Sequence, residues 1–274
     1  MAAPLLQFTD KGIYCPQGDF YIDPWRGVKR AIITHAHSDH SRWGSQYYLA
    51  HKLSEPIMRL RLGQDINLET VDYHQPIYMN NVKVTLYPAG HIIGSAQVRV
   101  EYEGQVWVAS GDYKVVPDPT CAPFEVVPCD TFITEATFAS PIYRWPDTSE
   151  VAADIVAWRR ECGERGEAAI LLCYALGKAQ RVLAELLPLD DQPAWLHGAI
   201  DNGVQVYRQA GVPMLAMMAA WGRKHMPVSE DLAIRAQILM RSVTPVLEAR
   251  ARRLMEQGAR VALSARSAGK LEAL

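Results

Sequence analysis

The sequence predicts a mixed α/β protein in which a mostly β unit is followed by a unit that alternates helices and strands. In the first half, apolar runs at 82–87, 96–102 and 105–109 have the alternation that is typical of strands. After a segment rich in proline and aromatic residues at 141–146, helical and strand patterns take turns. The 274 residues, 49% of them hydrophobic and 21% charged, are enough to bury a large core.

The elements of the first unit follow in order. Residues 13–15 and 20–22 predict a hairpin, and the apolar run 31–34 predicts a buried strand. A short helix is predicted at 55–62, where Gly63 would end it. The strands 82–87, 96–102 and 105–109 come next, and Glu103-Gly104 predicts a tight turn between the last two.

The second unit begins with a predicted helix that Asp147 and Glu150 would cap and that would end near Gly163. An apolar strand at 168–172, a helix to about Leu187, a strand at 194–197 and a helix at 204–210 follow. Amphipathic patterns at 231–239 and 245–255 predict two further helices.

The segment from His35 to His40 (HAHSDH) places three imidazoles and a carboxylate directly after the predicted strand 31–34. Side chains at i and i+2 of an extended chain point the same way, so His35 and His37 can bind one cation together. Asp39 and His40 lie further around the turn and can reach a second cation. Imidazole with carboxylate suits zinc, with manganese or iron as substitutes. The alternative is a polar loop that happens to be rich in histidine.

Two further candidate ligands follow later strands. His91 comes after the predicted strand 82–87, and Asp112 comes after the predicted strand 105–109. Small residues around His91 let the backbone come close. Taken singly, His91 also fits a core histidine and Asp112 fits a turn residue. The order of a cluster, a strand-end histidine and a strand-end aspartate is what favours a metal site.

That order resembles the metallo-β-lactamase superfamily, whose H-x-H-x-D-H motif is matched in full by residues 35–40. The resemblance implies an αββα sandwich with a two-metal site at one edge. It implies the following ligands: His35, His37 and His91 for the first metal, Asp39 and His40 for the second, and Asp112 as the bridge. Asp39 and Asp112 would also steer the proton of the nucleophile. Asp23 resembles an early strand-end aspartate that holds ligating imidazoles in one tautomer.

A narrower resemblance, to the β-CASP nucleases, covers roughly the first three quarters of the chain. The segment 134–138 resembles their acidic first motif, in which Glu135 would orient a general acid. Residues 173–181 look like the strand-to-helix turn of the β-CASP insert, where Lys178 and Arg181 could hold phosphate. His197 looks like a His-Gly of the same insert. The alternatives are a helix start with a solvated Lys-Arg face, and a polar residue that closes a strand.

Residues 14–25 and 117–124 are closer still to one bacterial group, exonucleases encoded beside an ATP-dependent DNA ligase. This resemblance implies a metal-binding domain at 1–137, a partial β-CASP-like α/β insert at 138–213, and a divergent, mostly helical tail at 214–274. The sandwich would then be incomplete at the C-terminus.

The tail departs from the family. β-CASP nucleases carry two late histidines, a general acid and a ligand of the second metal, and neither has a match in this chain. After Asp112 the sequence contains His197 and His225, and His225 fits an exposed basic loop. Residues 258–267 resemble a dehydrogenase strand without the glycine-rich turn, so we expect no nucleotide cofactor. We expect two divalent metals, with weaker occupancy of the second site and reduced or absent turnover.

Composition limits the partners. A net charge of −2 argues against a long electrostatic footprint on DNA, but metals would add positive charge at the site. No apolar run has the length of a membrane span, and residues 1–6 do not read as a signal peptide. Five cysteines without a CxxC pair predict reduced thiols and a cytoplasmic location.

The sequence therefore favours a metal-dependent nuclease that uses a metal-activated hydroxide. DNA is favoured over RNA, exonuclease over endonuclease action, and a functional association with an ATP-dependent DNA ligase is implied by the resemblance. One alternative is a small-molecule hydrolase of the same superfamily, such as a lactamase or thioesterase. The other is a non-catalytic remnant that binds nucleic acid or a partner.

Overall fold

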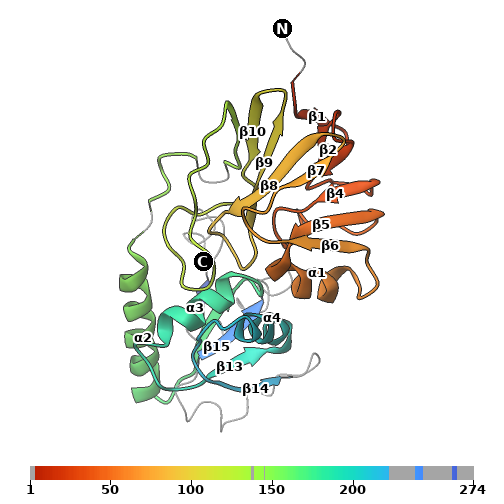
Figure 1. Cartoon of the computed structure of the whole chain (residues 1–274). Helices are drawn as coiled ribbons and strands as arrows, with labels where there is room; N and C mark the ends of the chain where they lie inside the picture. Colours follow the sequence, from red (N-terminus) through yellow and green to blue (C-terminus); the bar gives the residue numbers. More distant parts are fainter. Residues whose placement is uncertain (1–3, 137–138, 145, 222–237, 243–260, 264–274) are drawn as a thin grey trace. The chain divides into compact units, whose positions relative to one another are not determined.

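The computed structural model describes residues 4–136, 139–144, 146–221, 238–242 and 261–263 (Figure 1). The chain divides into two compact units, Met1–Tyr143 and Arg144–Leu274. Two sheets form the framework of the first unit, and one sheet forms that of the second. This is the mixed α/β architecture that the sequence predicts.

The six-stranded sheet of the first unit keeps its strands in chain order. They are β1 (Gln7–Thr9), β2 (Gly12–Cys15), β3 (Phe20–Ile22), β4 (Arg30–Ile32), β5 (Tyr47–His51) and β6 (Leu68–Val71). The first three strands pair antiparallel, which confirms the predicted hairpin. From β3 to β6 the pairing is parallel. β4 ends at Ile32, so the chain is already turning where the ligand motif begins.

The five-stranded sheet of the same unit has the order β11-β10-β9-β8-β7. These are β7 (Ile77–Met79), β8 (Val82–Pro88), β9 (Ala96–Tyr102), β10 (Gln105–Ala109) and β11 (Thr131–Ile133). The bounds of β9 and β10 confirm the predicted strands, and the two pair antiparallel across the Glu103-Gly104 turn. β11 joins β10 in parallel.

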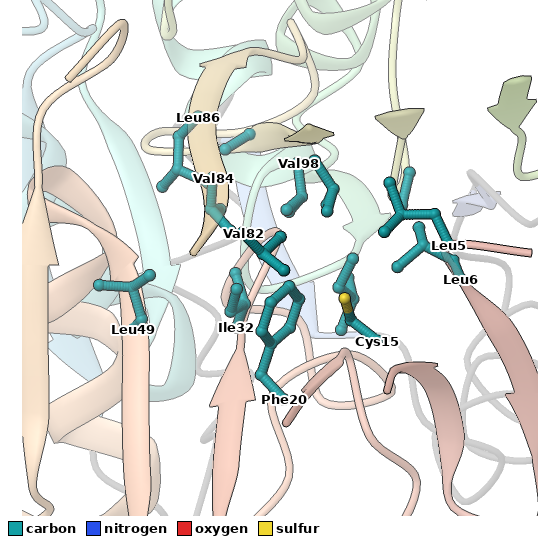
Figure 2. Packing of buried hydrophobic residues seen from close by; sticks show 14 of the residues in the cluster. Leu5, Leu6, Cys15, Phe20, Ile32, Leu49, Val82, Val84, Leu86 and Val98 are labelled. Atoms are coloured by element: carbon teal, nitrogen blue, oxygen red, sulfur yellow. The ribbon is translucent and has the colours of Figure 1, made fainter. Parts of the chain in front are cut away.

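One hydrophobic core is shared by the two sheets (Figure 2). Phe20 and Ile32 enter it from the six-stranded sheet, and Val84 and Val98 from the five-stranded sheet; all four are fully buried. Each such side chain contributes about 1.5–3 kcal/mol when it leaves water. The two sheets are thus the β layers of the sandwich that the resemblance implies.

The helix predicted at 55–62 is present as α1 (Glu55–Leu62), preceded by the short helix η1 (Lys52–Ser54). The buried hydroxyl of Ser54 donates to the carbonyl of Gly94 over 3.0 Å. Gly94 has a φ of +71°, and a Cβ there would lie 2.4 Å from the Ser54 hydroxyl. This close approach ties the start of α1 to the loop between β8 and β9.

The second unit alternates helix and strand around a parallel sheet of order β14-β13-β15-β12-β16. Its elements are α2 (Thr148–Glu164), β12 (Ala169–Cys173), α3 (Lys178–Leu186), β13 (Ala194–His197), α4 (Gly198–Gln209), β14 (Met217–Trp221), β15 (Ile238–Ser242) and β16 (Val261–Leu263). Asp147 caps α2 by accepting from the amide of Ser149 over 2.8 Å, as its sequence position predicts.

Two predictions in this unit need correction. α4 begins at Gly198 rather than 204, because the ring of His197 accepts from the amide of Ala199 and caps the helix early. Ile238 and Leu239, predicted as helical, begin β15. A short apolar run fits either state, and pairing with β12 and β13 decides for the strand. The rest of the predicted helices at 231–237 and 245–255, together with His225, lies outside the described residues.

Candidate metal centre

Three connections of the first unit carry the candidate ligands. The turn after β4 carries the 35–40 motif, the loop between β8 and β9 carries His91, and the loop after β10 carries Asp112. β8, β9 and β10 are neighbours in one sheet, and the amide of Ala96 donates to the carbonyl of Thr34 over 2.8 Å. That bond joins the two sheets where the candidate ligands lie.

One group of four side chains has ligand atoms that all lie within 4.8 Å of one another: His35, His37, His91 and Asp112. Nδ1 of His37 lies 3.0 Å from Nε2 of His35 and 3.2 Å from Nε2 of His91. The Oδ2 atom of Asp112 lies 3.4 Å from Nε2 of His91. The structure therefore brings together the three histidines expected at the first metal and the aspartate expected to bridge.

A second group joins Asp23, His35 and His40. Nδ1 of His40 lies 2.7 Å from Oδ2 of Asp23, and its Nε2 lies 3.2 Å from Oδ1 of Asp112. Because Nδ1 donates to Asp23, Nε2 of His40 is left with a lone pair that faces a carboxylate oxygen. Two acceptors at this distance need a cation or a proton between them.

The pKa shifts of His40 and Asp112 also indicate that positive charge is required between these two side chains. Burial disfavours the imidazolium, but hydrogen bonds to Asp112 and Asp23 outweigh it and raise the pKa of His40 to about 10. Burial opposes the ionised form of Asp112 too, yet the hydrogen bond from His40 and the nearby histidines hold the pKa of Asp112 below its usual value. Positive charge is favoured at this position, and a divalent cation would supply it.

The donor set fits a transition metal such as zinc. Imidazole nitrogens and one carboxylate converge from separate loops, which is the ligand chemistry that zinc sites use. His35 is fully buried at the back of the site, whereas the side chains of His91 and Asp112 remain 24% and 14% exposed. A bound metal would therefore be held by His35 on its buried side and be reachable from solvent past His91 and Asp112.

Thr34 and Gly111 determine how closely the turn after β4 and the loop after β10 approach each other. The sequence motif identifies neither residue. The Thr34 hydroxyl donates to Oδ2 of Asp23 over 2.5 Å and lies 3.0 Å from Nδ1 of His35. Gly111 has a φ of +55°, and a Cβ there would lie 2.5 Å from the Thr34 hydroxyl. The residue before Asp112 must therefore be glycine for the loop after β10 to come this close.

The His91 loop is held by Ser95, which the sequence reasoning also missed. The buried Ser95 hydroxyl accepts from the amides of His91 and Ile92 over 3.0 and 3.2 Å. The hydroxyl of Tyr73 donates to the Ser95 carbonyl over 2.8 Å. A small hydroxyl residue four positions after a candidate ligand is the signal that could have identified it.

Asp39 and Glu135 lie outside both groups. Asp39 is exposed on the turn, and its carbonyl accepts from Nε of Arg42 over 3.3 Å. Glu135 is exposed beyond β11, with its amide 3.4 Å from the Ser110 hydroxyl. Among the described residues, then, the second group offers Asp23 and His40 where the resemblance implied Asp39 and His40.

The three candidate phosphate contacts belong to the second unit. Lys178 is the first residue of α3, and Nε of Arg181 lies 3.4 Å from Oε1 of Glu185 one turn later in the same helix. His197 ends β13 and caps α4. Contact with phosphate by these three residues stays a prediction.

The chain is similar in sequence to proteins that are named for their action on nucleic acid. The chain is 32% identical over 203 residues to a "Probable DNA ligase" of Opitutus terrae, which covers 73% of this chain and 20% of that protein. It is 34% identical over 118 residues to the "Endoribonuclease YSH1" of Eremothecium gossypii, 42% of this chain and 15% of that protein. An "RNase J-like protein" of Methanocaldococcus jannaschii is 25% identical over 211 residues, 66% of this chain and 50% of that protein.

The chain spans between about one seventh and one half of the length of these relatives. A solved structure of a protein of unknown function from Enterococcus faecalis matches 85% of this chain and 68% of that chain, with a TM-score of 0.57 and 11% identity, which shows a shared fold. No family model matches the sequence. No helix among the described residues is long and apolar enough to cross a membrane.

Proposed function

We propose that this chain, which belongs to the metallo-β-lactamase superfamily in its β-CASP-like branch, is a metal-dependent hydrolase of phosphodiester bonds in nucleic acid. The observation that carries the proposal is the convergence of His35, His37 and His91 with Asp112, because their ligand atoms lie within 4.8 Å of one another. Two of the similar proteins are named as ribonucleases, and a third as a DNA ligase, so nucleic acid is the substrate class that they support.

The side chains have separate tasks in this proposal. His35, His37 and His91 would hold the first metal, while His40 and Asp112, with Asp39, would hold the second. Divalent metals, zinc in first place with manganese as a substitute, supply Lewis acidity at a phosphate and make hydroxide available near neutral pH. Asp112 can accept a proton from the attacking water, and Asp23 keeps the imidazole of His40 in the tautomer that leaves Nε2 free.

The finer proposal is a DNA exonuclease that works with an ATP-dependent DNA ligase in the cytoplasm, as in DNA repair. The similarity to a protein named as a DNA ligase supports this choice, and the two ribonuclease names support RNA as the competing substrate. Glu135 would orient a general acid. Lys178, Arg181 and His197 would contact phosphates from the second unit.

Asp39 is exposed and lies outside the second group of ligand atoms. The late histidine that would complete the second metal has no match in this chain, so the second metal should bind more weakly than the first, and turnover should be low. Metal analysis after gel filtration should give about one zinc per chain without added metal. Two tightly held zinc ions would contradict this part of the proposal.

The test uses single-stranded and duplex DNA and RNA of one sequence, labelled at either end, with zinc or manganese supplied. Mononucleotide release from DNA is expected, and chelation should abolish it. His37→Ala should lower the rate by about 100-fold or more because it removes a metal ligand. The matched control is His74→Ala, since His74 is exposed and pairs with Glu125 outside the metal groups.

Three outcomes separate the alternatives. If every DNA and RNA substrate stays intact, the nuclease proposal is wrong. Turnover of a thioester or β-lactam under the same conditions would assign the site to a small-molecule hydrolase. Cooperative, metal-stabilised unfolding without any hydrolysis would indicate a non-catalytic remnant.

A further inference from the structure

Two tryptophans lie exposed on the loops that adjoin the candidate metal centre. Trp43 is 77% exposed and follows His40 by three residues. Trp25 is 49% exposed and follows Asp23 by two residues. Neither indole belongs to the shared core of the two sheets, so neither is placed by packing in that core. Both indoles are therefore available to a ligand in solution.

The loop that carries Trp43 is held firmly. The side chain of Tyr48 is buried, and its hydroxyl donates to the carbonyl of Arg42 over 2.9 Å. The same hydroxyl accepts from the amide of Ser45 over 2.9 Å. One buried phenol thus spans the residues on either side of Trp43, and an exposed indole on a fixed loop loses little conformational freedom when it binds a ligand.

The two tryptophan loops also touch each other. A Cβ on Gly27 would lie 2.5 Å from the carbonyl of Gly44, so the two backbones are in direct contact. The amide of Val28 donates to the Ser45 hydroxyl over 3.3 Å. The loops that carry Trp25 and Trp43 thus lie side by side, and the Trp43 loop continues from the turn that carries the 35–40 motif.

Two guanidiniums lie against the backbone of that turn. Nε of Arg42 donates to the carbonyl of Asp39 over 3.3 Å, and Nη1 of Arg61 donates to the carbonyl of Ala36. A guanidinium carries several N–H donors, and among the described residues each of these two donates one to the turn. The remaining donors can serve an anionic ligand.

We propose that Trp25 and Trp43, with Arg42 and Arg61, form a binding surface for single-stranded nucleic acid beside the metal centre. The indoles stack on unpaired bases, and the guanidiniums bind the phosphates between them. Stacking tolerates any base sequence because every base has a π face. The surface places a strand at the metal ligands although the chain carries a net charge of −2. This inference rests on the proposed function, since it assumes a nucleic acid substrate.

The first test measures the affinity of the zinc-loaded protein for a short fluorescein-labelled single strand with a phosphorothioate backbone. Trp43→Ala should weaken binding by about 5- to 150-fold, the loss expected for one stacked base. Trp43→Phe should keep most of the affinity because it keeps a stacking ring. On an abasic strand of the same length, Trp43→Ala should have no effect, which separates stacking from a change in the fold.

The second test measures how binding depends on salt. Arg42→Gln and Arg61→Gln should each lower the slope of log affinity against log salt by about 0.7, because each removes one phosphate contact from a single strand. The charge control is Lys83→Gln, where the lysine pairs with Glu101 on the neighbouring strand. The aromatic control is Tyr78→Ala, a 69% exposed ring on the edge strand β7. Neither control should change affinity or slope by a comparable amount.

The outcomes distinguish this surface from the proposed function. If the wild-type protein cuts nucleic acid while the Trp43 and arginine variants bind and cut like wild type, the surface is wrong and the hydrolase stands. If the wild-type protein neither binds nor cuts any strand, both are wrong. Equal weakening by Trp43→Ala on normal and abasic strands would also overturn the stacking role.

Discussion

At the scale of single residues, the tautomers of the candidate ligands His35 and His40 are set by neighbours that do not themselves belong to the first group of candidate ligands. Asp23 accepts from Nδ1 of His40 and from both the amide and the hydroxyl of Thr34. Because the Thr34 hydroxyl donates to Asp23, Nδ1–H of His35 can donate to that hydroxyl, and Nε2 of His35 then faces the site. One carboxylate therefore governs which nitrogens of two histidines are available to a metal.

The change Asp23→Asn should lower zinc affinity by about 10- to 100-fold. The amide nitrogen of asparagine would donate to Nδ1 of His40 and so move its proton to Nε2, where it blocks ligation. Competition for zinc with a chromogenic chelator measures the loss. The matched control is Asp19→Asn, because Asp19 and Asp23 both have positive φ values, 52° and 44°, which asparagine tolerates. If both variants lost zinc equally, the tautomer argument would be wrong.

The residues of the candidate site differ in whether the sequence around them is enough to identify them. His35, His37, His40, His91 and Asp112 could be predicted from spacing at strand ends, and the structure brings them together. Thr34 and Gly111 could not, because each matters through a partner distant in sequence: Asp23 for Thr34, and Thr34 itself for Gly111. The exposed position of Asp39 likewise depends on how the turn after β4 folds.

At the scale of elements, three predictions match the structure residue by residue. β9, β10 and α1 have the bounds that the sequence predicts. The strands β1, β5, β6 and β7 were not predicted; β1, β6 and β7 are short, and β1 and β7 have no buried residue to mark an inner face, whereas β5 is buried over most of its length. Pairing with a neighbouring strand, which the local sequence does not encode, makes them strands.

The junction between β5 and η1 contains a buried histidine whose charge state affects stability. His51 is 2% exposed, stacks on Tyr73 with ring centroids 3.6 Å apart, and accepts from the amide of Leu53. Burial lowers the pKa of His51 to about 4. Since the pKa in the unfolded chain is near 6.5, the unfolded state binds more protons between these values.

The contribution of His51 to the free energy of unfolding should therefore be fully present above pH 6.5. It should be lost as the pH falls toward 4, which lowers the stability by on the order of 3 kcal/mol. His51→Asn keeps an acceptor for the Leu53 amide but cannot take up this proton. Urea unfolding of metal-free wild type and variant at pH 8 and pH 5 isolates the contribution as a difference of differences. An identical pH dependence in the two proteins would show that His51 does not titrate in this range.

At the scale of the whole molecule, the candidate metal chemistry is confined to one unit. The residues of both ligand groups lie within Met1–Tyr143. The boundary after Tyr143 falls within the segment 141–146 that composition marks as the crossing between units. In the tail from 214, which was expected to be mostly helical, the described elements β14, β15 and β16 are strands of the parallel sheet; β15 begins at two residues predicted as helical, and β16 lies in the segment 258–267 that resembles a dehydrogenase strand. Their pairing with β12 and β13 is long-range, so a window of local sequence does not contain it.

Zinc should therefore stabilise the first unit and leave the second unchanged. A ligand that binds the folded state at about 100 times its dissociation constant adds about 2.7 kcal/mol to stability. In hydrogen exchange, amides in 33–41 and 89–96 should gain protection with zinc, because Ser95 and Thr34 connect these backbones to the ligands. Amides of β12, α3 and α4 should exchange at the same rate with and without zinc.

His37→Ala is the control, since its first metal group lacks one nitrogen and the zinc-dependent protection should disappear. Protection that arises in β12 or α3 while 33–41 stays unchanged would place the metal elsewhere. Protection in both units, lost together in His37→Ala, would show instead that metal binding is transmitted from the first unit to the second. Either result would contradict the expectation that zinc stabilises the first unit alone. Hydrogen exchange can decide this because it measures the effect of binding on each segment separately.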